Sequence, residues 1–172
     1  MSIRSSQNGF TIIESLVALA ILSLSLMPML VVVTMSSRIA TSVKNNLVAA
    51  MLAQEGIEVV RAIRDTNWLN GRAFYIGLNE DAETGTTKDG LVQYDTANSL
   101  MPYDASAKLY VDNNSGIYSY DNNSNSSPTL FTRKISITKI SNAELKIISE
   151  ITWNEPPRSK IISVEDHLFD WK

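Results

Sequence analysis

Glu14 is the first residue whose chemistry stands out, because it is the only charged residue between Phe10 and Ser37. The rest of this 28-residue stretch is apolar or small and uncharged. A carboxylate inside a membrane helix costs about 2.5–3.5 kcal/mol on insertion scales, and residues of this kind are usually functional. Only a partner would offset that cost. The sequence therefore predicts a functional role for Glu14.

His167 beside Asp166 is the other pair that could do chemistry, since a Ser-His-Asp site uses these residue types. The chain has one histidine and no cysteine, which excludes disulfides and thiolate metal sites. It also lacks a nucleophile elbow, a phosphate-binding loop and a dinucleotide fingerprint. We therefore expect a surface histidine, no catalytic residue, no metal, no cofactor and no enzymatic activity.

Two segments rich in Asp, Asn and Ser, residues 112–116 and 121–128, offer many oxygen atoms that could bind calcium. Their spacing does not follow the 12-residue calcium loop and lacks its terminal Glu. We expect them to be exposed loops.

The element that must position Glu14 is a long apolar helix over residues 10–37, long enough to cross a bilayer. A polar leader, residues 1–9, precedes it and carries Arg4 as its only charged side chain. A secretory signal peptide is one alternative, since residues 18–20 read Ala-Leu-Ala, but the apolar run continues well beyond them. A simple signal anchor fits the hydropathy but leaves Glu14 unexplained.

The junction Gly9-Phe-Thr-Ile-Ile-Glu14-Ser-Leu-Val-Ala-Leu-Ala-Ile-Leu22 resembles the class III signal of type IV pilins and type II secretion pseudopilins. The resemblance covers about the first 25 residues. The apolar stretch that follows Glu14 resembles minor pilins of the pilus-modification type and the corresponding minor pseudopilins. The resemblance implies cleavage after Gly9 by a prepilin peptidase, which then N-methylates Phe10.

The resemblance also implies binding partners and a location in the cell. Glu14 would be an assembly determinant, because the amine of Phe10 in one subunit can meet the Glu14 carboxylate of a neighbour and set the register between them. Partners would be other pilin subunits, through the N-terminal helix, and the pilus assembly machinery. The precursor would cross the cytoplasmic membrane once with its head outside. The mature protein would enter a cell-surface pilus or a periplasmic or extracellular filament.

The helix is predicted to continue as an amphipathic segment over residues 38–66. Five apolar residues and one glutamine follow one another there at the three- and four-residue spacing of a helix face: Ile39, Val43, Leu47, Ala50, Met51 and Gln54. A helix from Phe10 to Asp65 has 56 residues and would be about 84 Å long. Asn67, Asn70 and Gly71 are candidate stop signals. Pro28 predicts a kink or a local opening.

Residues 67–172 are predicted to form a β-rich head. Period-two alternation predicts antiparallel strands at Phe131–Lys139, Leu145–Trp153 and Lys160–Glu165. Shorter β-prone pieces are Phe74–Leu78, Leu91–Tyr94, Leu109–Val111 and Ile117–Tyr120. With the outer half of the helix covering the sheet, the fold class is α+β. We expect Trp153, Phe169 and Trp171 to pack in the core or at an edge.

Charge narrows the function classes. The chain has 172 residues and a net charge of −3, and residues 66–172 alone carry ten cations and fourteen anions. An acidic head without a basic stripe argues against direct nucleic-acid binding. Three functions remain open: a minor subunit of a type IV pilus or pilus-like filament, a minor pseudopilin of a secretion or DNA-uptake machine, and a membrane-tethered module whose loops, residues 79–128, bind a surface or glycan.

Overall fold

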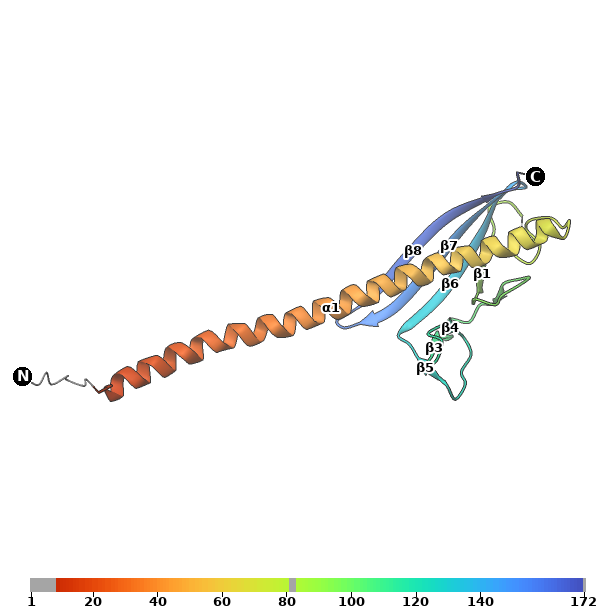
Figure 1. Cartoon of the computed structure of the whole chain (residues 1–172). Coiled ribbons are helices and arrows are strands. Elements are labelled where there is room, and N and C mark those ends of the chain that lie inside the picture. Colours follow the sequence, from red (N-terminus) through yellow and green to blue (C-terminus); the bar gives the residue numbers. More distant parts are fainter. Residues whose placement is uncertain (1–8, 81–82, 172) are drawn as a thin grey trace, which may run out of the picture. The chain divides into compact units, whose positions relative to one another are not determined.

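A computed structural model describes residues 9–80 and 83–171. The order of elements is one long helix, α1 (Ile12–Leu69), followed by eight strands. The chain divides into two compact units between Val43 and Lys44, so α1 contributes residues to both. Figure 1 shows the helix at the start of the chain and the strands after it. The predicted α+β class, a long N-terminal helix whose later part packs on an antiparallel sheet, is confirmed.

The two ends of α1 are set by capping residues. Thr11 precedes the helix, and its Oγ1 accepts a hydrogen bond from the backbone N–H of Glu14 (3.3 Å). At the other end, Gly71 adopts a positive φ of 65°, and Arg72 N donates to the carbonyl oxygen of Asn67 (2.8 Å). This is the Schellman arrangement, which satisfies the last carbonyls of a helix. The predicted stop at Gly71 is confirmed, whereas Asn67 lies inside the helix.

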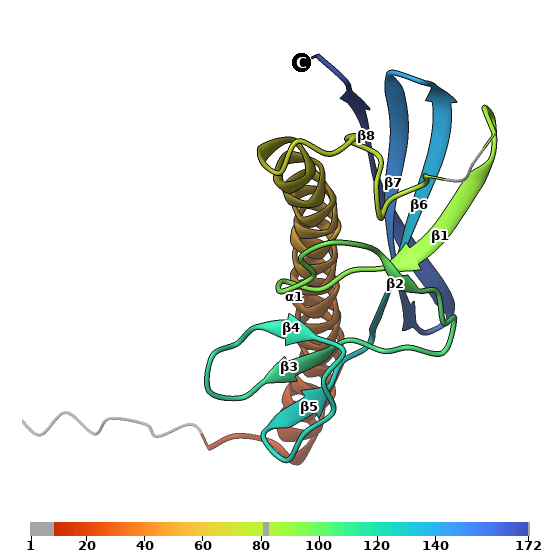
Figure 2. The ribbon, with the colours of Figure 1, turned by 90° about the vertical axis from the view of Figure 1, so that its right-hand side faces the viewer.

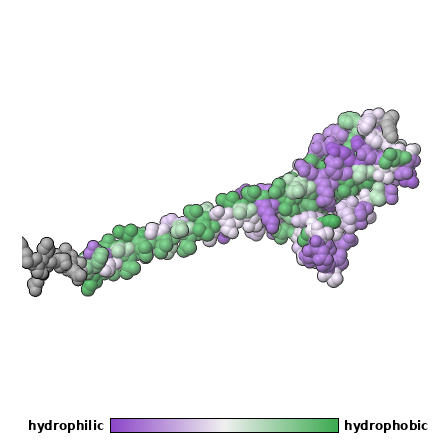
Figure 3. All heavy atoms as spheres, viewed as in Figure 1, coloured by the Kyte–Doolittle hydropathy of each residue, from purple (hydrophilic) through white to green (hydrophobic). Residues whose placement is uncertain are grey.

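The first unit contributes the apolar part of α1. Its large side chains are exposed, from Ile12 through Met35, and this part of the helix is long and apolar enough to cross a membrane. In Figure 3 the hydrophobic colour covers the beginning of the helix. The α-helix continues without interruption through Pro28, so the predicted local opening is not seen.

The second unit is built on a five-stranded antiparallel sheet in the order β2-β1-β6-β7-β8. The central strands are β6 (Phe131–Ser141) and β7 (Glu144–Glu155), with β8 (Arg158–Phe169) at one edge and β1 (Thr87–Leu91) and β2 (Met101–Pro102) at the other. Tight turns join β6 to β7 and β7 to β8. The three long predicted strands are confirmed, each somewhat longer than expected.

The later part of α1 lies against one face of this sheet, as Figure 2 shows in a view along the helix. One face of the helix is buried, from Ala49 to Asn67. The inward residues of β6 and β7 alternate with partly exposed ones, as the period-two pattern predicts. The residues that join helix and sheet in the core are Ile57, Val60, Ile63, Ile135, Ile137, Leu145 and Ile147.

Gly56 sets how closely the helix approaches the sheet. A Cβ built at this position would lie 2.5 Å from Ser149 Oγ and 2.9 Å from Ile135 Cδ1. No side chain fits there without displacement of a neighbour. The glycine is therefore placed for close packing despite its cost within a helix.

A small second sheet has the order β4-β3-β5, from β3 (Tyr110–Asp112), β4 (Tyr118–Ser119) and β5 (Ser126–Pro128). The predicted pieces Leu109–Val111 and Ile117–Tyr120 overlap β3 and β4. The piece Leu91–Tyr94 overlaps β1 only at Leu91.

The predicted strand Phe74–Leu78 is wrong. These residues form consecutive turns in which Ile76 N donates to Ala73 O (3.2 Å) and Leu78 N donates to Tyr75 O (3.0 Å). Phe74 and Leu78 are both buried. Their separation of four residues places two side chains on the same side of a helical turn. The apolar composition resembled a strand, but Gly77 takes a positive φ of 74° and turns the chain.

Candidate functional site

The first candidate site lies at the start of the described chain. Gly9 is exposed, and no other atom comes within 4 Å of the position where its Cβ would be. Phe10 is 84% exposed. The backbone between these residues is open to an approaching enzyme, because glycine presents no side chain. The rest of the predicted leader, including Arg4, lies outside the described residues.

Glu14 lies three residues after the capping residue Thr11. The Thr-x-x-Glu spacing is that of a capping box, in which the glutamate at the third helical position faces the free N–H groups of the first turn. Within the part of the chain that the structure describes, the Glu14 carboxylate has no hydrogen bond or ion pair. The Thr-x-x-Glu pattern stands in the sequence and is the signal by which Thr11 could have been identified.

A second feature is an apolar stripe of exposed residues along the outer half of α1. The predicted helical positions Ile39, Val43, Leu47 and Met51 are 60–63% exposed. The helix covers the sheet with another face, which begins at Ala49 and Leu52. The expected role of the outer helix as cover is right, but these four residues do not perform it.

In the second unit this stripe borders an open apolar groove. The groove has a volume of about 370 Å³. Helix residues and the loop around β4 form its walls: Val48, Met51, Leu52, Glu55, Gly116 and Tyr118.

Arg133 is a buried charged residue that sequence analysis missed. Its side chain is fully buried, and Nη1 donates to the carbonyl oxygen of Leu52 (3.1 Å) and to Glu55 Oε1 (3.2 Å). Nη2 donates to the carbonyl oxygen of Val92 (2.7 Å). The guanidinium thus joins the helix to the segment after β1. Arg133 shares the inward face of β6 with Phe131 and Ile135, but no sequence pattern shows what a buried arginine binds.

His167 lies on the outer face of β8 among carboxylates. Its Nδ1 is 2.7 Å from Glu144 Oε1, and its Nε2 is 3.4 Å from Glu165 Oε1. The hydrogen bond with Glu144 is the main cause that raises the pKa of His167 above its ordinary value. Asp166 faces away and pairs with Arg61 (2.9 Å), so Glu165 and Asp166 occupy opposite faces of the strand. Within residues 9–80 and 83–171, the hydrogen-bond partners of this histidine are carboxylates and not a nucleophilic hydroxyl group.

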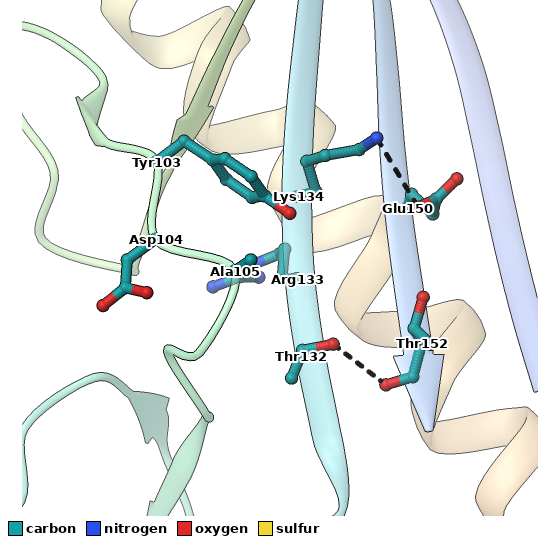
Figure 4. A pocket seen from close by; sticks show the side chains of 8 residues that line it. All are labelled: Tyr103, Asp104, Ala105, Thr132, Arg133, Lys134, Glu150 and Thr152. Atoms are coloured by element: carbon teal, nitrogen blue, oxygen red, sulfur yellow. Dashed lines mark hydrogen bonds and ion pairs between the residues drawn. The ribbon is translucent and has the colours of Figure 1, made fainter. Parts of the chain in front are cut away.

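A small polar hollow on the outer face of β6 and β7 is shown in Figure 4. Its volume is about 40 Å³, enough for water rather than for a larger ligand. Lys134 pairs with Glu150 across it (3.7 Å), and Thr132 Oγ1 donates to the carbonyl oxygen of Thr152 (3.3 Å). The hollow is lined by Tyr103, Asp104, Ala105, Thr132, Arg133, Lys134, Glu150 and Thr152.

The Asp/Asn-rich loops use their own oxygens internally. Asp112 Oδ1 accepts hydrogen bonds from the backbone N–H groups of Asn114 (3.0 Å) and Ser115 (2.8 Å), and Oδ2 accepts one from Asn125 (3.0 Å). These hydrogen bonds lower the pKa of Asp112, with the N–H of Ser115 as the largest cause. Among the described residues, no group of His, Asp and Glu is arranged to hold a metal ion.

Comparison with known proteins supports the site at the start of the chain. Residues 4–30 match the family model described as the prokaryotic N-terminal methylation motif. Residues 4–30 therefore carry a prepilin-type methylation motif, and the predicted resemblance is confirmed for this segment. The match includes Gly9, Phe10 and Glu14 and ends before the outer half of the helix. No curated protein and no solved structure matches the chain.

Proposed function

We propose that this chain is a minor subunit of a type IV pilus or pilus-like filament. It is cut after Gly9 by a prepilin peptidase, N-methylated at Phe10, and polymerised through α1. The observation that carries the proposal is the methylation motif over residues 4–30, together with a Glu14 carboxylate that has no partner within the described chain. The methylated amine of Phe10 in a neighbouring subunit is the cation that Glu14 would meet.

The uncovered stripe supports a filament over a simple membrane tether. If the bilayer takes about 20 residues from Ile12, then Leu47 and Met51 lie about 24–30 Å farther along the helix. Lipid does not reach them, and their own head does not cover them. In a filament, the helices of neighbouring subunits would cover them, held by packing in lipid and by the hydrophobic effect in water.

The precursor would cross the cytoplasmic membrane once, with the head outside, before the assembly machinery draws it into a filament. The same motif would serve a minor pseudopilin of a secretion or DNA-uptake machine. Deletion of the gene separates the two systems: loss of surface pili supports the pilus assignment, and loss of protein secretion or DNA uptake with normal pili supports the other.

Glu14→Ala tests the assembly role directly. In cells that make filaments, we expect the variant to reach the membrane at the normal level but to be lost from sheared filaments, because the helix then lacks its register contact. Immunoblots of the membrane and filament fractions measure this ratio. A Glu14→Ala protein that enters filaments as well as the wild type would remove the proposed role of Glu14.

The stripe has a matched control within the head. Leu47→Ser combined with Met51→Ser removes apolar surface that we assign to a neighbouring helix. Ile161→Ser removes an apolar side chain that is equally exposed, at 60%, but lies on β8. We expect only the first variant to be depleted from filaments. Equal incorporation of both would contradict the assignment of the stripe.

A further inference from the structure

The start of α1 lies just beyond the bond that we propose the prepilin peptidase cuts. Gly9, Phe10 and Thr11 have non-helical backbone, and the first helical residue is Ile12. Neither Gly9 nor Phe10 forms a backbone–backbone hydrogen bond with another described residue. The carbonyl group of Gly9, at which hydrolysis of this bond takes place, therefore lies outside the hydrogen-bonded helix.

Two hydrogen bonds make Thr11 the N-cap of α1. Its carbonyl oxygen accepts the first bond of the helix, from Ser15 N (3.1 Å), and its Oγ1 accepts one from Glu14 N (3.3 Å). In a helix one residue longer, the N–H of Glu14 would donate to the carbonyl oxygen of Phe10, because helical bonds join residues four apart. The Thr11 hydroxyl therefore occupies the donor that a longer helix needs.

The sequence before Thr11 offers other starting points for a helix. Asn8 and Gly9 are both residue types that favour the N-cap position. In a helix capped by either of them, the carbonyl oxygen of Gly9 would accept a hydrogen bond from the N–H of Ile13, four residues later. The Gly9–Phe10 peptide would then belong to the first turn of the helix, where the next turn shields that carbonyl group.

Cleavage needs access to that carbonyl group. Water adds across the bond: its hydroxyl group joins the carbonyl carbon of Gly9, its proton joins the nitrogen of Phe10, and the bond between them breaks. We propose that Thr11 is a positioning residue for this step, because its hydroxyl group holds the start of α1 at Ile12 and keeps the Gly9–Phe10 bond outside the helix. This inference rests on the proposed function, in which the chain is cut at that bond.

The test measures cleavage of the full precursor by purified prepilin peptidase, in membranes from cells that lack this enzyme. Mass spectrometry of the N-terminal peptide follows the reaction. Thr11→Val keeps the shape of the side chain but removes the hydrogen-bond acceptor, whereas Thr11→Ser keeps the acceptor. Thr41→Val removes a hydroxyl group that bonds to the carbonyl oxygen of Ser37 (3.1 Å) within α1, and it serves as the matched control.

A double variant separates the start of the helix from recognition of the hydroxyl group by the peptidase. Ile12→Pro places proline at the first helical position, where its missing N–H is not needed. Proline also disfavours a helical conformation of the residue before it, so the helix cannot easily extend toward Gly9. Thr11→Val combined with Ile12→Pro therefore restores the start of the helix without restoring the hydroxyl group.

We expect Thr11→Val to lower kcat/KM about five-fold, the effect of a lost N-cap. The loss should be a raised KM with kcat unchanged, because only chains with the bond outside the helix are substrates. Thr11→Ser, Thr41→Val and the double variant should be cut like the wild type.

Three results would overturn the inference, and they differ from one another. Equal cleavage of Thr11→Val and the wild type would show that the N-cap does not govern access to the bond. Rescue by Thr11→Ser but not by the double variant would show that the peptidase contacts the hydroxyl group itself. A wild-type precursor that is not cut would overturn the proposed function as well.

Discussion

At the scale of the residue, the chain handles two charges in opposite ways. Arg133 is fully buried, but two backbone carbonyls and Glu55 accept hydrogen bonds from it within the head. Glu14 stands in an apolar stretch with no partner among the described residues. A buried charge is tolerated only when it is paired. Both Nη atoms of Arg133 are paired within one molecule, although its buried Nε has no hydrogen-bond partner among the described residues. Under the proposed function, a second molecule would supply the partner of Glu14.

Arg133→Met tests the buried contact. Methionine keeps an extended side chain of related shape but leaves the carbonyl of Val92 without its donor. We expect the free energy of unfolding to fall by about 1–3 kcal/mol, the cost of an unsatisfied buried acceptor. Urea unfolding of the full chain in detergent micelles, followed by tryptophan fluorescence, measures the change. Unaltered stability would show that the guanidinium contributes no net free energy.

His167 makes the stability of the head depend on pH. Its contact with Glu144 raises the pKa of the folded state above the ordinary value of about 6.5. A raised pKa means that the stabilisation is fully present below pH 6.5 and is lost as the pH rises through the folded pKa. We expect the urea midpoint to decrease over that interval in the wild type and to change less in His167→Gln. Identical pH profiles of the two proteins would exclude this role for His167.

At the scale of the element, Gly56 decides how closely α1 and the sheet can pack. Gly56→Ala gains helix propensity of up to about 1 kcal/mol, but the added methyl group overlaps Ser149 Oγ at a cost of about 1–3 kcal/mol. We expect net destabilisation. Ser149→Ala should be close to neutral, because the buried Oγ has no hydrogen-bond partner among the described residues.

The double variant Gly56→Ala with Ser149→Ala distinguishes overlap from other effects. Removal of Ser149 Oγ makes room for the new methyl group, so we expect the pair to be more stable than Gly56→Ala alone. Urea midpoints of the four proteins form a double-mutant cycle. Strict additivity would mean that the contact with Ser149 does not limit the approach of the helix.

The elements that sequence predicted well are those with a clear period. The alternation in β6 and β7 follows from one covered face, and the helix follows from an apolar run closed by Gly71. Phe74–Leu78 failed because a short apolar segment does not reveal whether it turns or extends. The buried face of α1 also escaped prediction, since small residues such as Ala49, Ala53 and Gly56 form much of it. These small residues have low hydropathy values, so a hydropathy pattern does not mark them as buried, although they allow the closest packing of helix and sheet.

At the scale of the whole molecule, the two units differ in how much of their function the sequence predicts. Gly9, Phe10 and Glu14 could be selected in advance because their chemistry depends on local spacing, which the matched motif over residues 4–30 shares. The contacts of Arg133 could not be selected, because Leu52, Glu55 and Val92 reach it only through the fold of the second unit. Local sites are thus readable from spacing, and composite sites require the fold.

The most direct test of the central claim is the mass of the mature N-terminal peptide, isolated from cells that process other prepilins. We predict a chain that begins at Phe10 and carries one methyl group on its amine. Gly9→Val, which places a branched side chain beside the cleaved bond, should retain the leader. A wild-type protein with its first nine residues intact, or one that begins after Ala20, would contradict the account.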